Sequence, residues 1–158
     1  MIKVGILTVS DSCARGERED ASGQAIEQML SAGKYEICRK KVVPDDADLI
    51  AEELICCSDE ARLDLVLTTG GTGLGPRDVT PEATVSVCER MAPGFGEAMR
   101  MEGLKKTPNA ILSRGVAGIR GSTLVVNLPG SPKAVRECLG LIADVLPHAV
   151  EMMLGGGH

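Results

Sequence analysis

The chain has 158 residues, a formal net charge of −5 and 44% hydrophobic residues, which fits one domain with a substantial core. No run approaches the roughly 18 apolar residues of a membrane span, and one Tyr, one Phe and no Trp leave no platform on which nucleic-acid bases could stack. We therefore expect neither membrane insertion nor binding to nucleic acid. The six cysteines form no CxxC pair, so we expect no zinc site and reduced thiols in a cytoplasmic protein.

The first half of the chain is predicted to alternate strands and helices. Residues 2–10 form a β-rich run, a first strand rather than a signal peptide, and a helix capped by Asp20 or Ser22 follows and ends at Gly33. Residues 35–43 are a second strand, halted by Pro44, and a helix begins at Asp45 or Asp46. Residues 63–69 are a nearly continuous apolar run, typical of a strand that is buried on both faces.

The second half continues the alternation. Thr80 and Pro81 predict a hydroxyl N-cap followed by proline, the start of a helix to about residue 91. A turn and a second helix follow over residues 93–106, and two short strands flank a turn at residues 120–121. A last helix is predicted over residues 132–151. The pattern indicates one α/β domain over residues 1–158, with a mainly parallel sheet and helices on both faces.

A methionine-rich stripe lies in the region of the helix predicted over residues 93–106. Because methionine adapts to irregular surfaces, this stripe fits either a surface that meets another subunit or an ordinary core face. The stripe consists of Met91, Phe95, Met99, Met101 and Leu104.

Four polar segments follow the predicted strands. They are residues 10–12 (SDS), 44–46 (PDD), 68–73 (TTGGTG) and 127–133 (NLPGSPK). In an open α/β sheet, ligands bind beyond the carboxyl ends of the strands. We therefore expect these segments to share one edge and to form the functional site there.

The glycine loop TTGGTG exposes backbone N–H groups without intervening side chains and adds threonine hydroxyls. Such a loop suits a phosphate or a flat ring that lies against the main chain, although a tight structural turn is the alternative. It is neither a Walker loop nor GxGxxG. Ser131, Pro132 and Lys133 predict a second anion site at a helix N-terminus, for which ordinary capping is the alternative.

Asp78 lies between the glycine loop and a helix start. A carboxylate beside a bound phosphate requires a cation between them, and Mg²⁺ is usually held by one or two carboxylates plus phosphate oxygens. Asp45 is a candidate second carboxylate. Each aspartate is alternatively a cap or turn residue, and Asp46 and Asp48 are equally suitable as caps.

Six motifs extend over essentially the whole chain, in the order TVSDS, VVPDD, LVLTTGGTGLGPRDVTPEAT, MAPGFGEAMR, AILSRGVAGIR and VVNLPGSPKAV. In order and spacing they resemble the MogA/MoaB family of molybdenum cofactor biosynthesis proteins. The resemblance implies a molybdopterin-binding α/β domain that assembles as a homotrimer. It further implies adenylyl transfer from ATP to molybdopterin with the help of Mg²⁺, giving pyrophosphate and a product for a partner protein that inserts molybdate.

The resemblance also implies roles for individual residues. The two functional aspartates of the family, expected to act in catalysis and to hold the metal, fall on Asp45 and Asp78. Backbone N–H groups, Lys133, Arg77 and Arg114 are expected to compensate the charge of two anionic substrates. The residues expected to bind substrate are Ser10, Asp11, Ser12, Thr69, Gly70, Gly71, Thr72, Gly73, Gly94, Glu97, Ser113, Arg114, Asn127, Pro129, Gly130, Ser131 and Lys133.

Three functions are compatible with these patterns. The first is a molybdopterin adenylyltransferase, which the presence of both aspartates favours. The second is a MoaB-like trimeric protein that binds molybdopterin without adenylylating it. The third is an unrelated glycine-loop nucleotide binder, which would bind ATP equally well without Mg²⁺ or pterin.

Overall fold

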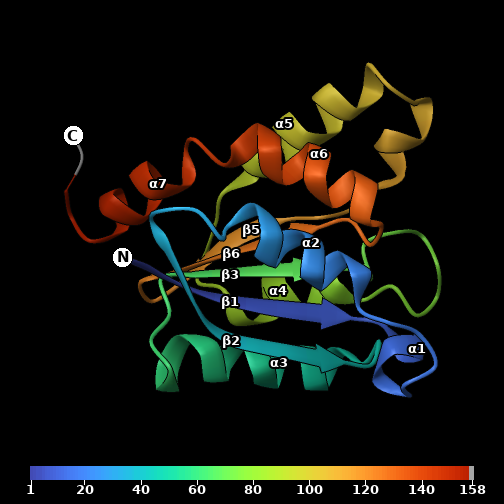
Figure 1. The fold of residues 1–158 in the computed structure, drawn as a ribbon, viewed down its shortest axis with the longest axis horizontal. Helices are drawn as coiled ribbons and strands as arrows, with labels where there is room; N and C mark the ends of the chain where they lie inside the picture. Colours follow the sequence, from blue (N-terminus) through green and yellow to red (C-terminus); the bar gives the residue numbers. More distant parts are fainter. Residues whose placement is uncertain (157–158) are drawn as a thin grey trace.

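The computed structural model describes residues 1–156 as a six-stranded sheet with helices on both faces (Figure 1). The strands are β1 (Ile2–Val9), β2 (Tyr35–Val43), β3 (Leu65–Thr69), β4 (Arg90–Met91), β5 (Ala117–Arg120) and β6 (Thr123–Leu128). The α-helices are α1 (Asp11–Ala14), α2 (Ala21–Met29), α3 (Ala47–Ile55), α4 (Thr80–Val87), α5 (Pro93–Leu104), α6 (Pro132–Ile142) and α7 (Leu146–Met153). A π-helical turn, η1 (Cys56–Glu60), and a 3₁₀ helix, η2 (Pro108–Leu112), complete the set.

The strand order is β2-β1-β3-β6-β5-β4. Four neighbouring strands pair in parallel, namely β2, β1, β3 and β6. Leu67 in β3 therefore lies between Ile6 in β1 and Val126 in β6. The strands β5 and β4 add an antiparallel edge. The predicted α/β fold with a mainly parallel sheet is confirmed. Because β1, β2, β3 and β6 run in the same direction, their carboxyl ends meet at one edge.

Two cores form because successive side chains of a strand point to opposite faces of the sheet. Ile6, Leu65 and Leu67 pack on one face beneath α2, α5, α6 and α7. Leu7 and Val66 pack on the other face against α3 and α4. Figure 1 shows these two helical layers above and below the strands. This packing fixes the strand ends, and with them the loops that follow.

Several element boundaries differ from those predicted. The strand β2 has the predicted bounds, whereas β3 begins at Leu65 rather than at residue 63. Asp20 caps α2 and Asp46 caps α3, which settles both open choices of cap. The prediction of Thr80 as an N-cap was wrong, because Thr80 is already helical and its hydroxyl donates to Gly70 O at 3.0 Å.

The helix predicted over residues 132–151 is two helices, with a break at residues 143–145. Pro147 lies in the first turn of α7, where its missing N–H is tolerated, whereas in the interior of one long helix it would remove a hydrogen bond. The helix predicted to reach residue 91 ends at Val87, and Arg90 and Met91 pair with β5 instead. The short helix α1 was not predicted.

The methionine-rich stripe is divided between the core and the surface, so its core alternative holds in part and its subunit-contact alternative stays a prediction. Met99 is buried in the core, and Phe95 packs against it. Met91, Met101 and Leu104 are exposed. Within residues 1–156 no helix is long and apolar enough to cross a lipid bilayer, and His158 lies outside the described residues.

Candidate active site

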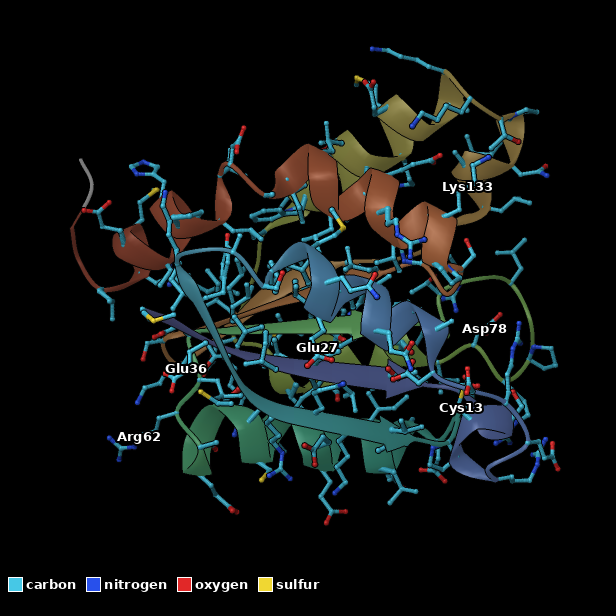
Figure 2. The ribbon with its side chains drawn as sticks, in the orientation of Figure 1. Cys13, Glu27, Glu36, Arg62, Asp78 and Lys133 are labelled. Atoms are coloured by element: carbon cyan, nitrogen blue, oxygen red, sulfur yellow. The ribbon has the colours of Figure 1, made fainter. Side chains whose placement is uncertain are left out.

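A polar cavity of about 260 Å³ lies at the carboxyl ends of β1, β3 and β6. We call it the polar cavity. Figure 2 shows Asp78 and Cys13 at this end of the sheet, with Lys133 at the start of α6. Its lining residues are Thr8, Val9, Ser10, Cys13, Arg18, Glu19, Ala21, Ser22, Asp45, Thr69, Gly70, Gly71, Asp78, Gly130 and Pro132. Both predicted carboxylates and the central glycines therefore share one cavity.

The glycine loop requires glycine at two positions. Gly70 and Gly71 have φ values of +97° and +69°, in the left-handed region where a Cβ is costly. A Cβ on Gly70 would overlap Val9 O, and one on Gly71 would overlap the hydroxyl of Thr80. The Thr80 hydroxyl donates to Gly70 O and the Thr80 N–H donates to Gly71 O at 3.1 Å, which fixes the turn.

We expect Gly70→Ala to destabilise the fold by about 1–3 kcal/mol, because both its φ and its contact with Val9 O disfavour a side chain. Thermal or urea unfolding measures this loss. Gly16→Ala is the matched control, since Gly16 also has a positive φ (+74°) but no atom within 4 Å of the added Cβ. If both variants lose the same unfolding free energy, the close approach of Gly70 to β1 contributes nothing to the cost of the substitution.

Asp78 is held by its own loop. Its Oδ2 accepts the N–H of Gly75 at 3.0 Å, and its own N–H donates to Gly75 O at 3.0 Å. Its Oδ1 accepts no hydrogen bond from the described residues. The carboxylate is half-buried on the wall of the polar cavity, so one oxygen remains for a ligand.

Asp45 approaches the glycine loop from the end of β2. Its Oδ2 accepts the N–H of Asp11 at 2.9 Å. Its Oδ1 would lie 3.3 Å from a Cβ placed on Gly71, so this oxygen is next to the loop. Burial raises the pKa of the Asp45 carboxyl, and the negative charges of Asp11 and Asp78 raise it further, although the bond from Asp11 opposes them.

The two carboxylates suit a magnesium ion. Among residues 1–156 no three His, Cys, Asp or Glu side chains are grouped as a metal site. Mg²⁺ is commonly held by one or two carboxylates together with substrate phosphates and water, and it does not need an all-protein cage. Asp45 and Asp78 provide this incomplete set, each with an oxygen to which the described residues donate no hydrogen bond.

An apolar cavity of about 240 Å³ lies on the other side of the loop between β6 and α6. Pro129 lines this apolar cavity, whereas the next residue, Gly130, lines the polar one. Three predicted residues contribute to its wall: Ser113, Asn127 and Pro129. The two adjacent cavities suit a molecule or a pair of molecules that carry both rings and phosphates.

Several predicted substrate-binding residues make contacts within the protein. The Asn127 amide is buried and donates to the hydroxyls of Thr68 and Thr84, while its oxygen accepts the N–H of Val116. The hydroxyl of Thr69 donates to Pro129 O at 2.6 Å. These two polar groups hold the strand ends together.

The predicted helix start at Ser131 and Pro132 is confirmed, whereas the anion site predicted there stays a prediction. Ser131 caps α6 by accepting the N–H of Ala134 at 3.2 Å. Lys133 is exposed at the first turn and has no ion pair among the described residues. Neither residue lines the two cavities, whereas Gly130 and Pro132 beside them do line the polar one.

Arg114 hydrogen-bonds to the glycine loop and the segment that follows it. Its guanidinium donates to Gly73 O at 2.8 Å and to Asp78 O at 2.7 Å, and it pairs with Glu82. Its backbone N–H donates to Thr72 O at 2.8 Å. Thr72 is buried. Arg114 thus holds the loop from outside the polar cavity.

Some predicted residues lie outside both cavities. Gly94 lines a separate apolar groove, and Glu97 is exposed on α5. Ser12 approaches Ser10, with 3.2 Å between their hydroxyl oxygens. The structure does not bring Gly94, Glu97 or Ser12 to the walls of the polar or the apolar cavity.

Other lining residues were not predicted. Arg18 and Glu19 come from the polar segment after β1, and Ser22 comes from the first turn of α2, where its hydroxyl donates to Gly130 O at 3.0 Å. Arg100 lines the apolar cavity and donates to Gly115 O at 2.9 Å. The length and the charge of the segment after β1 were the available signals that Arg18 and Glu19 could belong to the site.

The fold and the site together define an α/β domain that presents a glycine loop and two carboxylates at the carboxyl edge of its sheet. A family model described as "probable molybdopterin binding domain" matches residues 5–148. The chain therefore belongs to this family, and the resemblance noted in the sequence is confirmed.

Relatives extend over most of the chain. A Helicobacter pylori protein named molybdopterin adenylyltransferase is 49% identical over 158 residues, covering 98% of this chain and 89% of the relative. An Escherichia coli K12 protein of the same name is 41% identical over 146 residues, covering 90% of this chain and 74% of the relative. The crystal structure of the molybdopterin biosynthesis enzyme MoaB from Thermus thermophilus superposes with a TM-score of 0.93 at 52% identity, covering 99% and 98% of the two chains.

Proposed function

We propose that the protein is a molybdopterin adenylyltransferase that acts in the cytoplasm and forms adenylylated molybdopterin and pyrophosphate from ATP and molybdopterin. The observation that carries this proposal is the polar cavity, in which Asp45 and Asp78 face a glycine loop beside an apolar cavity. The relatives that bear this name are 41–49% identical to the chain.

In this reaction a phosphate oxygen of molybdopterin forms a bond to the α-phosphorus of ATP, and the bond from that phosphorus to the bridging oxygen of pyrophosphate breaks. Such a transfer needs positioning and charge neutralisation more than a protein nucleophile. The backbone around Gly70 and Gly71 can lie against the phosphates because no side chain intervenes. Asp45 and Asp78 would hold Mg²⁺, which when bound would supply charge neutralisation for the phosphates.

The apolar cavity fits the ring end of a substrate. Its walls come from α5, η2, α6 and the segment around Ser113, with Arg100 at hydrogen-bond distance from Ser113 O (3.4 Å) and Gly115 O (2.9 Å). Pro129 and Gly130 separate it from the polar cavity. A heterocycle on one side and reacting phosphates on the other would meet across this loop.

The experiment that tests the function follows the conversion of molybdopterin to its adenylylated form with Mg-ATP by chromatography. Product formation with release of pyrophosphate supports the enzyme. A folded protein that binds molybdopterin but forms no product is the MoaB-like binding protein instead. Equal ATP affinity with and without Mg²⁺ and pterin would indicate the unrelated nucleotide binder.

We also propose that the protein assembles as a homotrimer. An apolar groove of about 430 Å³ lies between the start of α5 and the end of α6, and Leu141 and Val145 on it are 41% and 52% exposed. Exposed apolar side chains that line one groove favour a contact with another subunit. We expect sedimentation at micromolar concentration to give three times the mass of one chain, and a monomer would contradict this.

A further inference from the structure

The residue next to Asp78 makes a two-point ion pair across the site. Arg77 Nε donates to Asp11 Oδ2 at 2.7 Å, and Arg77 Nη2 donates to Asp11 Oδ1 at 3.0 Å. The side chain of Arg77 is 64% exposed, and that of Asp11 is 24% exposed. The guanidinium of Arg77 is thus turned back onto Asp11, the first residue of α1. The Arg77 pair is the main cause that lowers the pKa of Asp11 to about 2.

Asp11 in turn holds Asp45. The N–H of Asp45 donates to Asp11 Oδ1 at 2.9 Å, and the N–H of Asp11 donates to Asp45 Oδ2 at 2.9 Å. Each aspartate therefore accepts the backbone N–H of the other. A continuous series of contacts leads from Asp45 through Asp11 to Arg77, and Arg77 is bonded in sequence to Asp78.

This series opposes a repulsion that is built into the site. Asp45 and Asp78 line the same cavity, so two carboxylates of like charge face it from the end of β2 and from the glycine loop. Without a tether, like charges would favour a glycine loop that moves away from the end of β2. Arg114 fixes the other side of that loop through Gly73 O and Asp78 O.

We infer that Asp11 and Arg77 are a positioning pair that sets the separation of Asp45 and Asp78 and does not contact substrate. This inference rests on the proposed function of the site. Neither residue lines the polar or the apolar cavity. Asp11 thereby acquires a different role from the substrate contact that the resemblance implied. An exposed ion pair contributes little stability by itself, so its effect should be seen in catalysis.

The test compares Asp11→Asn, Arg77→Gln and the double variant. The amide oxygen introduced by Asp11→Asn still accepts the N–H of Asp45, so the fold is retained and Tm falls by no more than a few degrees. We expect each single variant to lose about 10- to 100-fold in kcat with a small change in the KM for ATP, because a misplaced group slows the reacting step. The double variant should be no slower than the worse single variant, since the two residues act through one contact.

The matched control is another bidentate pair. Arg120 donates to Asp59 at 3.1 and 2.7 Å and joins positions 61 apart in sequence, as Arg77 and Asp11 join positions 66 apart. Asp59→Asn and Arg120→Gln touch neither cavity and should leave kcat unchanged. Single losses that multiply in the double variant, or a rise in KM without a fall in kcat, would overturn the inference.

Amide hydrogen exchange separates this inference from the proposed function. In the substrate-free protein, Asp11→Asn and Arg77→Gln should speed exchange in residues 72–79, whereas the Asp59 and Arg120 variants should not. If the wild type forms no adenylylated product, the proposed function fails, but faster exchange still supports the tether. Unchanged exchange in residues 72–79 refutes it whatever the activity.

Discussion

Replacement of Asp78 by Asn should reduce adenylylation of molybdopterin by roughly 10²- to 10³-fold, the loss typical when one charge-stabilising group is removed from an active site. The amide oxygen can still accept the N–H of Gly75, which lies 3.0 Å from Asp78 Oδ2, so the loop should keep its shape. The charge that offsets a cation beside the phosphates is lost. Chromatography of the product formed with saturating Mg-ATP measures the effect.

Asp64→Asn is the control for this substitution. Asp64 Oδ2 accepts the N–H of Lys3 at 2.9 Å, a contact like that of Asp78, but it lies just before β3 at the opposite end of the sheet. We expect wild-type turnover from Asp64→Asn. Full activity of Asp78→Asn at equal Mg²⁺ would contradict the assigned role, and equal losses in both variants would indicate a general effect of the charge.

The sequence predicted the parallel strands and the edge that carries the site, because these depend on local patterns. Residues 35–43 are followed by Pro44, and the predicted and observed bounds of β2 agree. The residues of β3 are buried throughout, as its continuous apolar run indicated. Asp45 and Asp78 were singled out because each follows a strand or a glycine loop at that edge, and both line the polar cavity.

The elements that were missed depend on single contacts. The helix α1 has four residues and no apolar period, and what marks its start is the hydroxyl of Ser10, which accepts the N–H of Cys13 at 3.2 Å. In contrast, the break between α6 and α7 had a signal in Pro147, which the prediction of one helix over residues 132–151 did not use.

The pairing of Arg77 with Asp11 could not be predicted from local pattern. The two residues are 66 positions apart, and both were expected to face anionic substrates. Their orientation depends on the packing of the β1 and β3 ends, which fixes where each loop starts. A charged residue near a phosphate site is therefore compatible with two roles until the direction of its side chain is known.

Replacement of Asp45 by Asn should separate activity from stability. We expect a loss of activity of at least about 100-fold, because one of the two carboxylates facing the glycine loop is gone. The melting temperature should stay the same or rise. The amide oxygen of this variant can still accept the N–H of Asp11, and the half-buried negative charge beside Asp11 and Asp78 is removed.

The sign follows from the direction of the pKa shift. The pKa of Asp45 is raised in the folded protein, so the folded state holds this proton more tightly than the unfolded chain, and ionisation of Asp45 costs stability. The cost grows as the pH rises from the ordinary aspartate value of 3.8 through the raised pKa, and it is fully present once the pH exceeds that raised pKa. Any gain in the Tm of Asp45→Asn should therefore vanish below about pH 4.

The pKa of Asp11 is shifted in the opposite direction to that of Asp45, so ionisation of Asp11 stabilises the fold. Its pKa is lowered to about 2, chiefly by the bond from Arg77, so its ionised form stabilises the fold above the ordinary value of 3.8, and this contribution is lost as the pH falls towards 2. Asp11→Asn should thus lower the Tm slightly at pH 7.

The control for Asp45→Asn is Asp46→Asn. This neighbouring variant keeps the cap on α3 and should retain activity. A lower Tm for Asp45→Asn at pH 7 would mean that the contacts of the Asp45 carboxylate outweigh the cost of its half-buried charge, and the site would then not be strained by its own carboxylates.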